Sequence, residues 1–413
     1  MTKKSDAPAI RFKGFSDAWE QRKLGELVDR VVRKNTNNES TLPLTISAQY
    51  GLVDQITYFN NRVASRDVSN YYLVLNGEFA YNKSTSDGYP FGAVKRLDLY
   101  EKGVLSTLYI VFTPKKEQQI NSDFLTVFFD TDRWHKGVAE RAAEGARNHG
   151  LLNISAEDFF DIDLSVPKDV AEQKQIGVFI RQLDNLITLH QRKFEKLTNV
   201  KKSMLEKMFP QNGSSYPIIR FKGFTDPWEQ RKVGEVSESY SGGTPSVGVK
   251  EYYGGQIPFI RSAEINSEIT ELFLTEEGLK NSSARLVAVG DILYALYGAT
   301  SGEVGRARLK GAINQAILAI KPHTDYDSEY LAQWLRKSKH SIIETYLQGG
   351  QGNLSGTIVK ELSVDFPSLK EQKAIGDFFR QLDNLITLHQ RKPFIMKWRT
   401  SDANRNQTNR LVL

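Results

Sequence analysis

The stretch EQKQIGVFIRQLDNLITLHQRK spans residues 172–193, and EQKAIGDFFRQLDNLITLHQRK spans residues 371–392. The two are identical at 19 of 22 positions, at an offset of 199. A second pair, IRFKGFSDAWEQRKLGE at 10–26 and IRFKGFTDPWEQRKVGE at 219–235, is identical at 14 of 17 positions. The chain is therefore an internal duplication with a domain-sized period, and the 20–50-residue period of a solenoid is absent.

Each copy of the longer stretch has the spacing of an amphipathic helix with a heptad seam. Apolar residues recur three and four positions apart, and one histidine interrupts them in each copy. The seam residues are Ile176, Phe179, Leu183, Leu186 and His190 in the first copy, and Ile375, Phe378, Leu382, Leu385 and His389 in the second. Asp169 with Glu172, and Ser368 with Glu371, have the spacing of capping boxes.

The first helix is predicted over about residues 169–208, a length of ~60 Å. We expect the two seams to pack against each other as an antiparallel coiled coil with approximate twofold symmetry. The alternative is two separate amphipathic helices, each packed on its own domain.

The blocks before the helices have mixed α/β character (α+β). Alternating strands are predicted at 107–114, 290–298 and 312–322, and helices at 122–142 and 328–346. The predicted organisation is a first domain at 1–167, a spacer helix at 168–210, a second domain at 211–367, a spacer helix at 368–392 and a divergent tail at 393–413.

Composition narrows the class of protein. The 413 residues include no cysteine, which excludes disulfide scaffolds and thiolate chemistry. No apolar run is long enough to cross a membrane, and MTKKSDAPAIRFKGF lacks the apolar core of a secretory signal, so we expect a cytoplasmic protein. The net charge of +6 permits a polyanionic partner without demonstrating one.

No catalytic motif stands out. There is no P-loop, no HExxH zinc motif and no GxSxG elbow, and the six histidines lie at no metal-ligand spacing. We therefore expect no catalytic and no metal-binding residues, and a binding role. Two similar blocks on a rigid spacer suit duplex DNA, whose recognition surfaces repeat every ~34 Å.

Polar loops at matched places in the two blocks carry side chains suited to base edges and phosphates. Any one of them is equally well an ordinary solvated loop residue. The candidates are Tyr81, Asn82, Lys83, Ser84, Arg147, Asn148 and His149 in the first block, and Arg261, Ser262, Tyr297, Thr300, Ser301, Gln351 and Asn353 in the second.

From residue 10 to residue 392 the chain resembles the specificity subunit of type I restriction–modification systems. The resemblance rests on the paired WEQRK segments at 19–23 and 228–232, on SGGTPS…IPFIRSAEI, and on the two Pro…EQKxI…QLDNLITLHQRK helices. It implies two target recognition domains, each reading half of a split sequence in double-stranded DNA, and a coiled coil that sets the spacing.

The resemblance also implies partners and cofactors. The chain would be non-catalytic and would assemble with two methyltransferase subunits, which use S-adenosylmethionine, and with restriction subunits, which use ATP and Mg²⁺. It would hold no cofactor itself. The alternative is a non-catalytic scaffold with two protein-interaction modules on a coiled-coil spacer. A stand-alone nuclease or methyltransferase has no motif to support it.

The second helix departs from the first after Lys392, where PFIMKWRTSDANRNQTNRLVL replaces FEKLTNVKKSMLEKMFPQ. Proline lacks the N–H that a helix needs, so Pro393 is predicted to end the helix and the polar remainder to be disordered. The distal seam of the first helix, at Leu197, Val200, Met204 and Met208, would then lose its partner.

Overall fold

The computed structural model describes residues 8, 10–47, 50–86, 88–117, 119–142, 150–211, 213–347 and 353–402, with the backbone alone for 391–402. The described chain forms two compact units, one containing the residues up to Thr188 together with residues 396–402, and the other containing Leu189–Ile395. One division falls inside α6 (Val170–Lys207), which gives its first half to one unit and its second half to the other. A second division falls inside α11 (Leu369–Asp402), between Ile395 and Met396.

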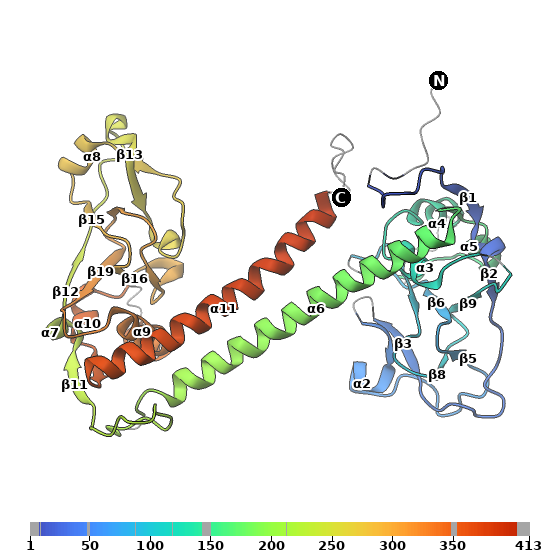
Figure 1. Cartoon of the computed structure of the whole chain (residues 1–413), viewed down its shortest axis with the longest axis horizontal. Helices are drawn as coiled ribbons and strands as arrows, with labels where there is room; N and C mark the ends of the chain where they lie inside the picture. Colours follow the sequence, from blue (N-terminus) through green and yellow to red (C-terminus); the bar gives the residue numbers. More distant parts are fainter. Residues whose placement is uncertain are drawn as a thin grey trace. The chain divides into compact units, whose positions relative to one another are not determined.

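The first unit contains short strands and helices ahead of α6 (Figure 1). Its strands are β1 (Glu20–Lys23), β2 (Val28–Arg30), β3 (Leu44–Ser47), β4 (Gly51–Asp54), β5 (Tyr72–Leu75), β6 (Phe79–Asn82), β7 (Ala93–Arg96), β8 (Lys102–Leu105), β9 (Ile110–Pro114) and β10 (Asp163–Val166). Its shorter helices are α1 (Leu24–Leu27), α2 (Gln55–Phe59), α3 (Ser122–Phe129), α4 (His135–Arg141) and α5 (Ala156–Phe160).

The second unit repeats this plan after α6. Its strands are β11 (Glu229–Lys232), β12 (Ser237–Ser241), β13 (Tyr253–Ile260), β14 (Phe273–Leu274), β15 (Arg285–Val287), β16 (Ile292–Ala295), β17 (Val304–Arg306), β18 (Gly311–Ile313), β19 (Ile317–Pro322) and β20 (Ser363–Phe366). Its helices are α7 (Val233–Val236), α8 (Glu276–Lys280), α9 (Ser328–Leu347), α10 (Gly356–Glu361) and α11 (Leu369–Asp402), with 3-10 turns η1 (Lys250–Tyr252), η2 (Ser262–Glu264) and η3 (Gly298–Thr300).

Equivalent four-stranded antiparallel sheets form the centre of both units. The strand order is β2-β9-β6-β7 in the first and β12-β19-β16-β17 in the second. Each sheet packs its apolar face into a core, with Phe79 and Phe112 in the first unit and Ile292 and Ile320 in the second fully buried. The predicted mixed α/β class, with two similar units and a long linking helix, is confirmed.

A duplicated ion pair fastens the start of each long helix to its unit. Arg11 donates two hydrogen bonds to Glu172 at 2.6 Å, and Arg220 donates two to Glu371 at 2.7 and 2.8 Å. Both carboxylates are almost wholly buried, at 0% and 1% exposed. Because a buried charge is tolerated only with a partner, the pair fixes these residue types in both copies. The carboxylates of both glutamates thus serve these ion pairs, while Asp169 of the first predicted capping box accepts the N–H of Ala171 at 2.7 Å.

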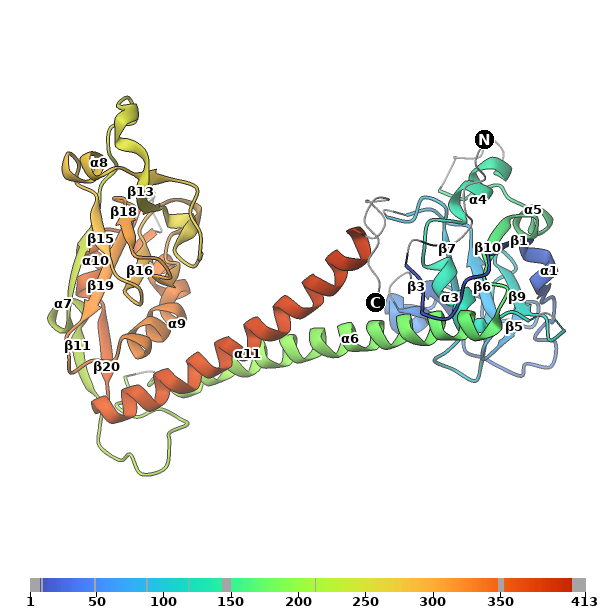
Figure 2. The ribbon, with the colours of Figure 1, turned by 45° about the horizontal axis from the view of Figure 1, so that its top comes forward.

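A small residue lets each long helix approach its unit closely. A Cβ on Gly177 would lie 2.7 Å from Cβ of Asp123 at the start of α3, and one on Gly376 would lie 2.6 Å from a carboxylate oxygen of Asp327 just before α9. Figure 2 shows the first turns of α6 alongside α3. Arg181 then bonds to Asp123 at 2.6 Å, so this contact is polar at its edge.

The secondary structure departs from the sequence predictions in three places. The helix predicted at 122–142 is two helices, α3 and α4, and the strand predicted at 312–322 is β18 and β19. The prediction that Pro393 ends the second long helix is wrong, because α11 runs on to Asp402. Proline inside a helix removes one hydrogen bond at a cost of about 3 kcal/mol, which a long helix can absorb. The rest of the predicted tail, 403–413, lies outside the described residues.

Candidate nucleic-acid interface

The two polar segments predicted in the first unit come together beyond the end of β6. Ser84 forms an isolated β-bridge with Leu151, and the N–H of Thr85 donates to the carbonyl of Gly150 at 2.7 Å. The loop after β6 therefore lies against the residues that directly follow Arg147–His149. Arg147, Asn148 and His149 themselves lie outside the described residues.

Tyr81 is a core residue, and the expectation that it contacts DNA is wrong. Its ring is fully buried and stacks on Phe159 at a centroid distance of 4.3 Å, and its hydroxyl donates to the carbonyl of Phe91 at 2.9 Å. Burial raises the pKa of Tyr81. Because side chains alternate along a strand, Tyr81 in β6 points into the core.

The other three candidates of this loop are accessible. Ser84 is exposed, and Asn82 and Lys83 are half-buried. Asn82 accepts a hydrogen bond from the N–H of Ser84 at 3.0 Å, and the ammonium of Lys83 donates to the carbonyl of Ile154 at 3.3 Å. These contacts hold the loop in shape, and a DNA contact of these residues stays a prediction.

The second unit brings its two predicted segments together in the same way. Tyr297 forms an isolated bridge with Asn353, and the N–H of Leu354 donates to the carbonyl of Leu296 at 2.9 Å. Asn353 is exposed, and Tyr297 is half-buried with its hydroxyl bonded to a backbone carbonyl at 2.6 Å.

In the loop that follows Tyr297, Thr300 ends η3 and is half-buried. Ser301 is 8% exposed and its hydroxyl points to the carbonyl of Leu296, so it supports the loop from within. Gln351 lies outside the described residues. The matched positions of the two loops are thus real, although not every named residue faces solvent.

Arg261 is engaged by acidic neighbours and is no free donor. Its guanidinium lies 2.7 Å from both Glu264 and Glu271, and these bonds raise the pKa of Arg261. Burial alone would raise the pKa of Glu264, but hydrogen bonds, chiefly from Arg261, lower it to about 2. Ser262 opens η2 beside this pair and is half-buried. The arrangement fixes a turn, and contact of Arg261 with a base would require breaking it.

Sequence reasoning missed the tip of the first loop. Ser86 and Tyr89 form an isolated bridge across a turn in which Gly88 has a φ of 76°. Tyr89 is 37% exposed, which places an aromatic ring with a hydroxyl on the surface. The signal was present in the sequence, because the serine–aspartate–glycine run after a strand is typical of a turn that presents its flanking side chains.

In the second unit, the distal seam of α6 packs against α11. The bonded pairs run in opposite directions along the two helices, with His190 beside His389 and Lys201 beside Asp383, so the packing is antiparallel. The Nδ1 atoms of the two histidines lie 2.8 Å apart. The expectation that the distal seam lacks a partner is wrong, because antiparallel packing places this seam against the beginning of α11 and away from its end. The apolar residues of this cluster include Leu197, Met204, Met208, Ile375, Phe379 and Leu382.

The remaining seam residues are covered less completely. Phe378 is half-buried, and Leu385 is 44% exposed. In the first unit, Ile176 packs on the core, whereas Phe179 and Leu186 are 38% and 43% exposed and Leu183 is half-buried. The heptad pattern therefore marks the helices correctly, but it does not mark a seam that is buried along its whole length.

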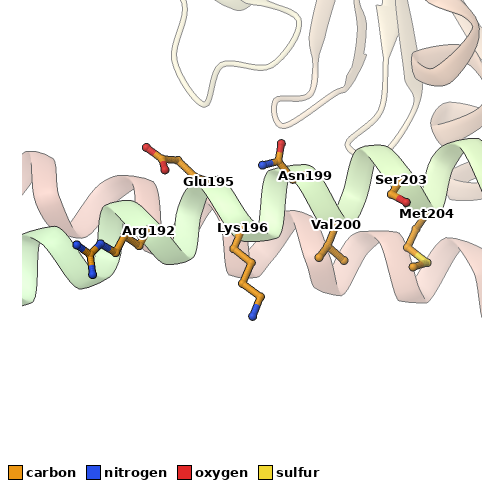
Figure 3. A pocket seen from close by; sticks show the side chains of 7 residues that line it. All are labelled: Arg192, Glu195, Lys196, Asn199, Val200, Ser203 and Met204. Carbon is orange, nitrogen blue, oxygen red and sulfur yellow. The ribbon is translucent and has the colours of Figure 1, made fainter. Parts of the chain in front are cut away.

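A shallow open hollow of about 550 Å³ lies along the second half of α6 (Figure 3). Figure 3 shows Lys196, Val200 and Met204 pointing to one side of the helix, and Asn199 pointing to the other. The hollow is lined by charged and apolar side chains, and these do not form a set of groups suited to catalysis. Within the described ranges, no three His, Asp or Glu side chains gather as they would around a metal ion. Among the residues that the structure describes, no helix is both long enough and apolar enough to cross a membrane.

The geometry defines a class of protein with two similar mixed α/β units, each presenting a matched pair of loops and each fastened to a long helix. The chain belongs to the family of type I restriction modification DNA specificity domains, whose family model matches residues 16–199 and again residues 225–394. One match thus falls on each half of the duplication.

Individual relatives agree with this family. The type I restriction enzyme MjaIX specificity subunit of Methanocaldococcus jannaschii is 32% identical over 167 residues, which is 38% of each chain. The putative type I restriction enzyme MjaX specificity subunit of the same organism is 22% identical over 91% of this chain and 89% of its own. The crystal structure of a type-I restriction-modification system S subunit from M. genitalium shares the fold, with a TM-score of 0.62 at 12% identity over 96% of this chain and 97% of that one.

Proposed function

We propose that this chain is the sequence-reading, non-catalytic subunit of a type I restriction–modification complex, in which each unit reads one half of a split target in duplex DNA. The observation that carries the proposal is the twofold family match, one per unit, on units that present the same pair of loops on the same central sheet. A doubled reader with unlike loop sequences fits a target with two unlike halves.

The contacts with DNA divide into two kinds in this proposal. Polar loop side chains such as Asn82, Ser84 and Asn353 read base edges, and lysines and arginines on the same faces bind phosphates. Phosphate contacts release counterions, so affinity falls steeply as salt rises. The net charge of +6 is consistent with such contacts and too small to carry affinity by itself.

The long helices set the spacing of the half-sites and dock the catalytic partners in this proposal. α6 is one continuous helix of 38 residues, ~57 Å at 1.5 Å per residue, and it belongs to both units. Two methyltransferase subunits would bind along the helices and use S-adenosylmethionine, and restriction subunits would use ATP and Mg²⁺. Base flipping and methyl transfer belong to those partners, and this chain holds no cofactor of its own.

The test is a methylation map. The full chain is purified with methyltransferase subunits of a type I system, incubated with S-adenosylmethionine and random-sequence DNA, and the methylated adenines are located by single-molecule sequencing. We expect one bipartite motif with a fixed gap. The double variant Asn82→Ala, Ser84→Ala should relax only one half of the motif, and Asn353→Ala only the other.

Two results would contradict the proposal. One is a motif in which either variant alters both halves. The other is the absence of methylation together with no salt-sensitive binding of duplex DNA by the assembled complex, which would favour a scaffold with two protein-binding modules. The control for folding is that each loop variant still assembles with the methyltransferase subunits as the wild-type chain does.

A further inference from the structure

The second unit has an apolar cap that comes from the end of α6. Phe209 is fully buried and its ring lies 5.2 Å from Tyr330, 6.1 Å from Phe379 and 6.3 Å from Trp228, measured between centroids. Met208 is 3% exposed and belongs to the same cluster, with Leu197, Met204 and Leu205 packed against it. Residues 197–209, the cap segment, therefore seal one face of this unit.

The surface that receives the cap is duplicated in the first unit. Trp19 and Phe124 meet edge to face at 5.9 Å, and Trp228 and Tyr330 do so at the same distance. Phe124 and Tyr330 occupy corresponding positions. Each lies three residues after a residue, Asn121 or Asp327, whose N–H donates to a glutamine at the start of the long helix at 2.8 Å. The offset of 199 then places Ile180 at the position of Phe379.

The exposure of this apolar surface to solvent differs between the two units. In the second unit Ile375 and Phe379 are only 2% and 0% exposed, and Trp228 and Leu382 are also buried. In the first unit the equivalents of all four are only partly buried. We call these equivalents, with Phe124, the α6 socket; its residues are Trp19, Phe124, Ile176, Ile180 and Leu183.

The end of α11, which belongs to the first unit from Met396 on, does not continue into a repeat of the cap segment's sequence. At the offset of 199, the counterparts of Met204, Met208 and Phe209 are Ala403, Gln407 and Thr408. An alanine and two polar residues cannot replace two methionines and a phenylalanine in an apolar socket, because each lost buried side chain forfeits about 1.5–3 kcal/mol of transfer free energy.

Charge in the socket matches the same missing segment. In the second unit, Lys201 of the cap helix bonds to Asp383 at 2.6 Å. The first unit carries Asp184 at the equivalent position, and this carboxylate is exposed. A helix that repeats the pattern of residues 192–211 would therefore present both its apolar face to the socket and a lysine to Asp184.

We propose that the α6 socket binds, in trans, a helix of another polypeptide that carries the pattern of residues 192–211. A second copy of this chain is a poor source of that helix. Among the described residues of each copy, the cap pattern is found at 197–209, and this segment already packs on its own second unit. Exchange between copies would expose one socket for every socket that it covers.

The probe is a fluorescent synthetic peptide with the sequence of residues 192–211, titrated into the full chain and followed by anisotropy. We expect saturable one-to-one binding. Ile180→Asp should weaken binding about tenfold or more, because it places a charge in the apolar socket. A peptide with Met204→Asp and Met208→Asp should not bind.

Two further variants separate the socket from its surroundings. Leu186→Asp changes a side chain that is as exposed as its counterpart Leu385, so binding should be unchanged. A chain in which the sequence of residues 194–211 replaces residues 393–410 should cover the socket in cis and no longer bind the peptide.

Three outcomes would overturn the proposal. They are a wild-type chain that does not bind the peptide, equal binding by wild type and Ile180→Asp, and a wild-type dimer in solution that Ile180→Asp dissolves. The last result would assign the socket to a second copy of this chain. Thermal melts of each variant identify any loss of folding, and none of the measurements requires DNA or a methyltransferase.

Discussion

The two units share their joints and differ around them. β1 pairs with β10 and β11 pairs with β20 in the same register, with Glu20 opposite Val166 and Glu229 opposite Phe366. The sequences nearly identical in the two halves thus form the strand that pairs with the one leading into each long helix, and the ion pair that fastens that helix. Near-identity therefore marks the framework of the protein and not its reading surface.

The divergent sequences build different structures on that framework. The first unit adds two separate two-stranded ladders, β3-β4 and β5-β8, whereas the second adds one four-stranded sheet in the order β14-β13-β18-β15. Both additions lie in the stretches with little residue identity. A duplicated gene product with constant joints and variable additions can change what each half binds without changing how the halves are held.

The largest expected effect is a loss of stability confined to the second unit, the one that has the apolar cap. Phe209→Ala should destabilise the second unit by about 3–5 kcal/mol, because it empties a site among Trp228, Tyr330 and Phe379. Hydrogen exchange measured by mass spectrometry should show weaker protection in residues of the second unit only. Equal loss of protection in both units would break the assignment of the cap to one of them.

The joints should respond alike in the two units. Glu172→Gln and Glu371→Gln each leave a mostly buried arginine without its counter-charge, which should cost about 3 kcal/mol. Glu172 also accepts a hydrogen bond from Trp19 at 3.3 Å, so its replacement should be at least as damaging. Urea denaturation followed by unit-specific hydrogen exchange measures both. A large effect at one joint and none at the other would show that the two pairs are not equivalent.

The reading loops should respond separately. Replacing residues 83–90 by a glycine–serine loop of equal length should lower affinity for DNA carrying the first half-site by about 1–3 kcal/mol for each base that the loop no longer binds. Affinity for the second half-site should not change. Competition binding with duplexes mutated in one half measures this directly, and the parallel replacement of residues 297–301 is the matched control.

Sequence patterns predicted the helices well because periodicity is a local property. The first long helix was expected at about 169–208 and is found at Val170–Lys207. The role of Glu172 was misjudged, since its partner Arg11 lies 161 residues away and no local pattern reports it. Pro393 was misjudged for the opposite reason, because a local penalty was taken as decisive in a long helix.

The candidate site was only partly accessible to such reasoning. The sequence placed the candidate loops at matched positions in the two halves, and the structure adds that the two loops of each half lie together in the described residues. Which side chains face solvent depends on strand alternation and on neighbours far away in sequence. Tyr81 is buried by Phe159, and Arg261 is held by Glu271 across a turn. Exposure is a property of the fold, so residue type alone could not supply it.

The smallest expected effect is a pH-dependent contribution of Glu264 to the stability of the second unit. The hydrogen bonds to Glu264 lower its pKa from about 4.5 to about 2 in the folded protein, although burial opposes the shift. A depressed carboxyl pKa stabilises the fold above the unfolded value, and this stabilisation is lost as pH falls from about 4.5 toward 2. Glu264→Gln should therefore destabilise the second unit at pH 7 and converge with wild type by about pH 2. Denaturant midpoints across this range measure the convergence. A constant difference would show that the side chain at position 264 acts by its shape and not by its charge.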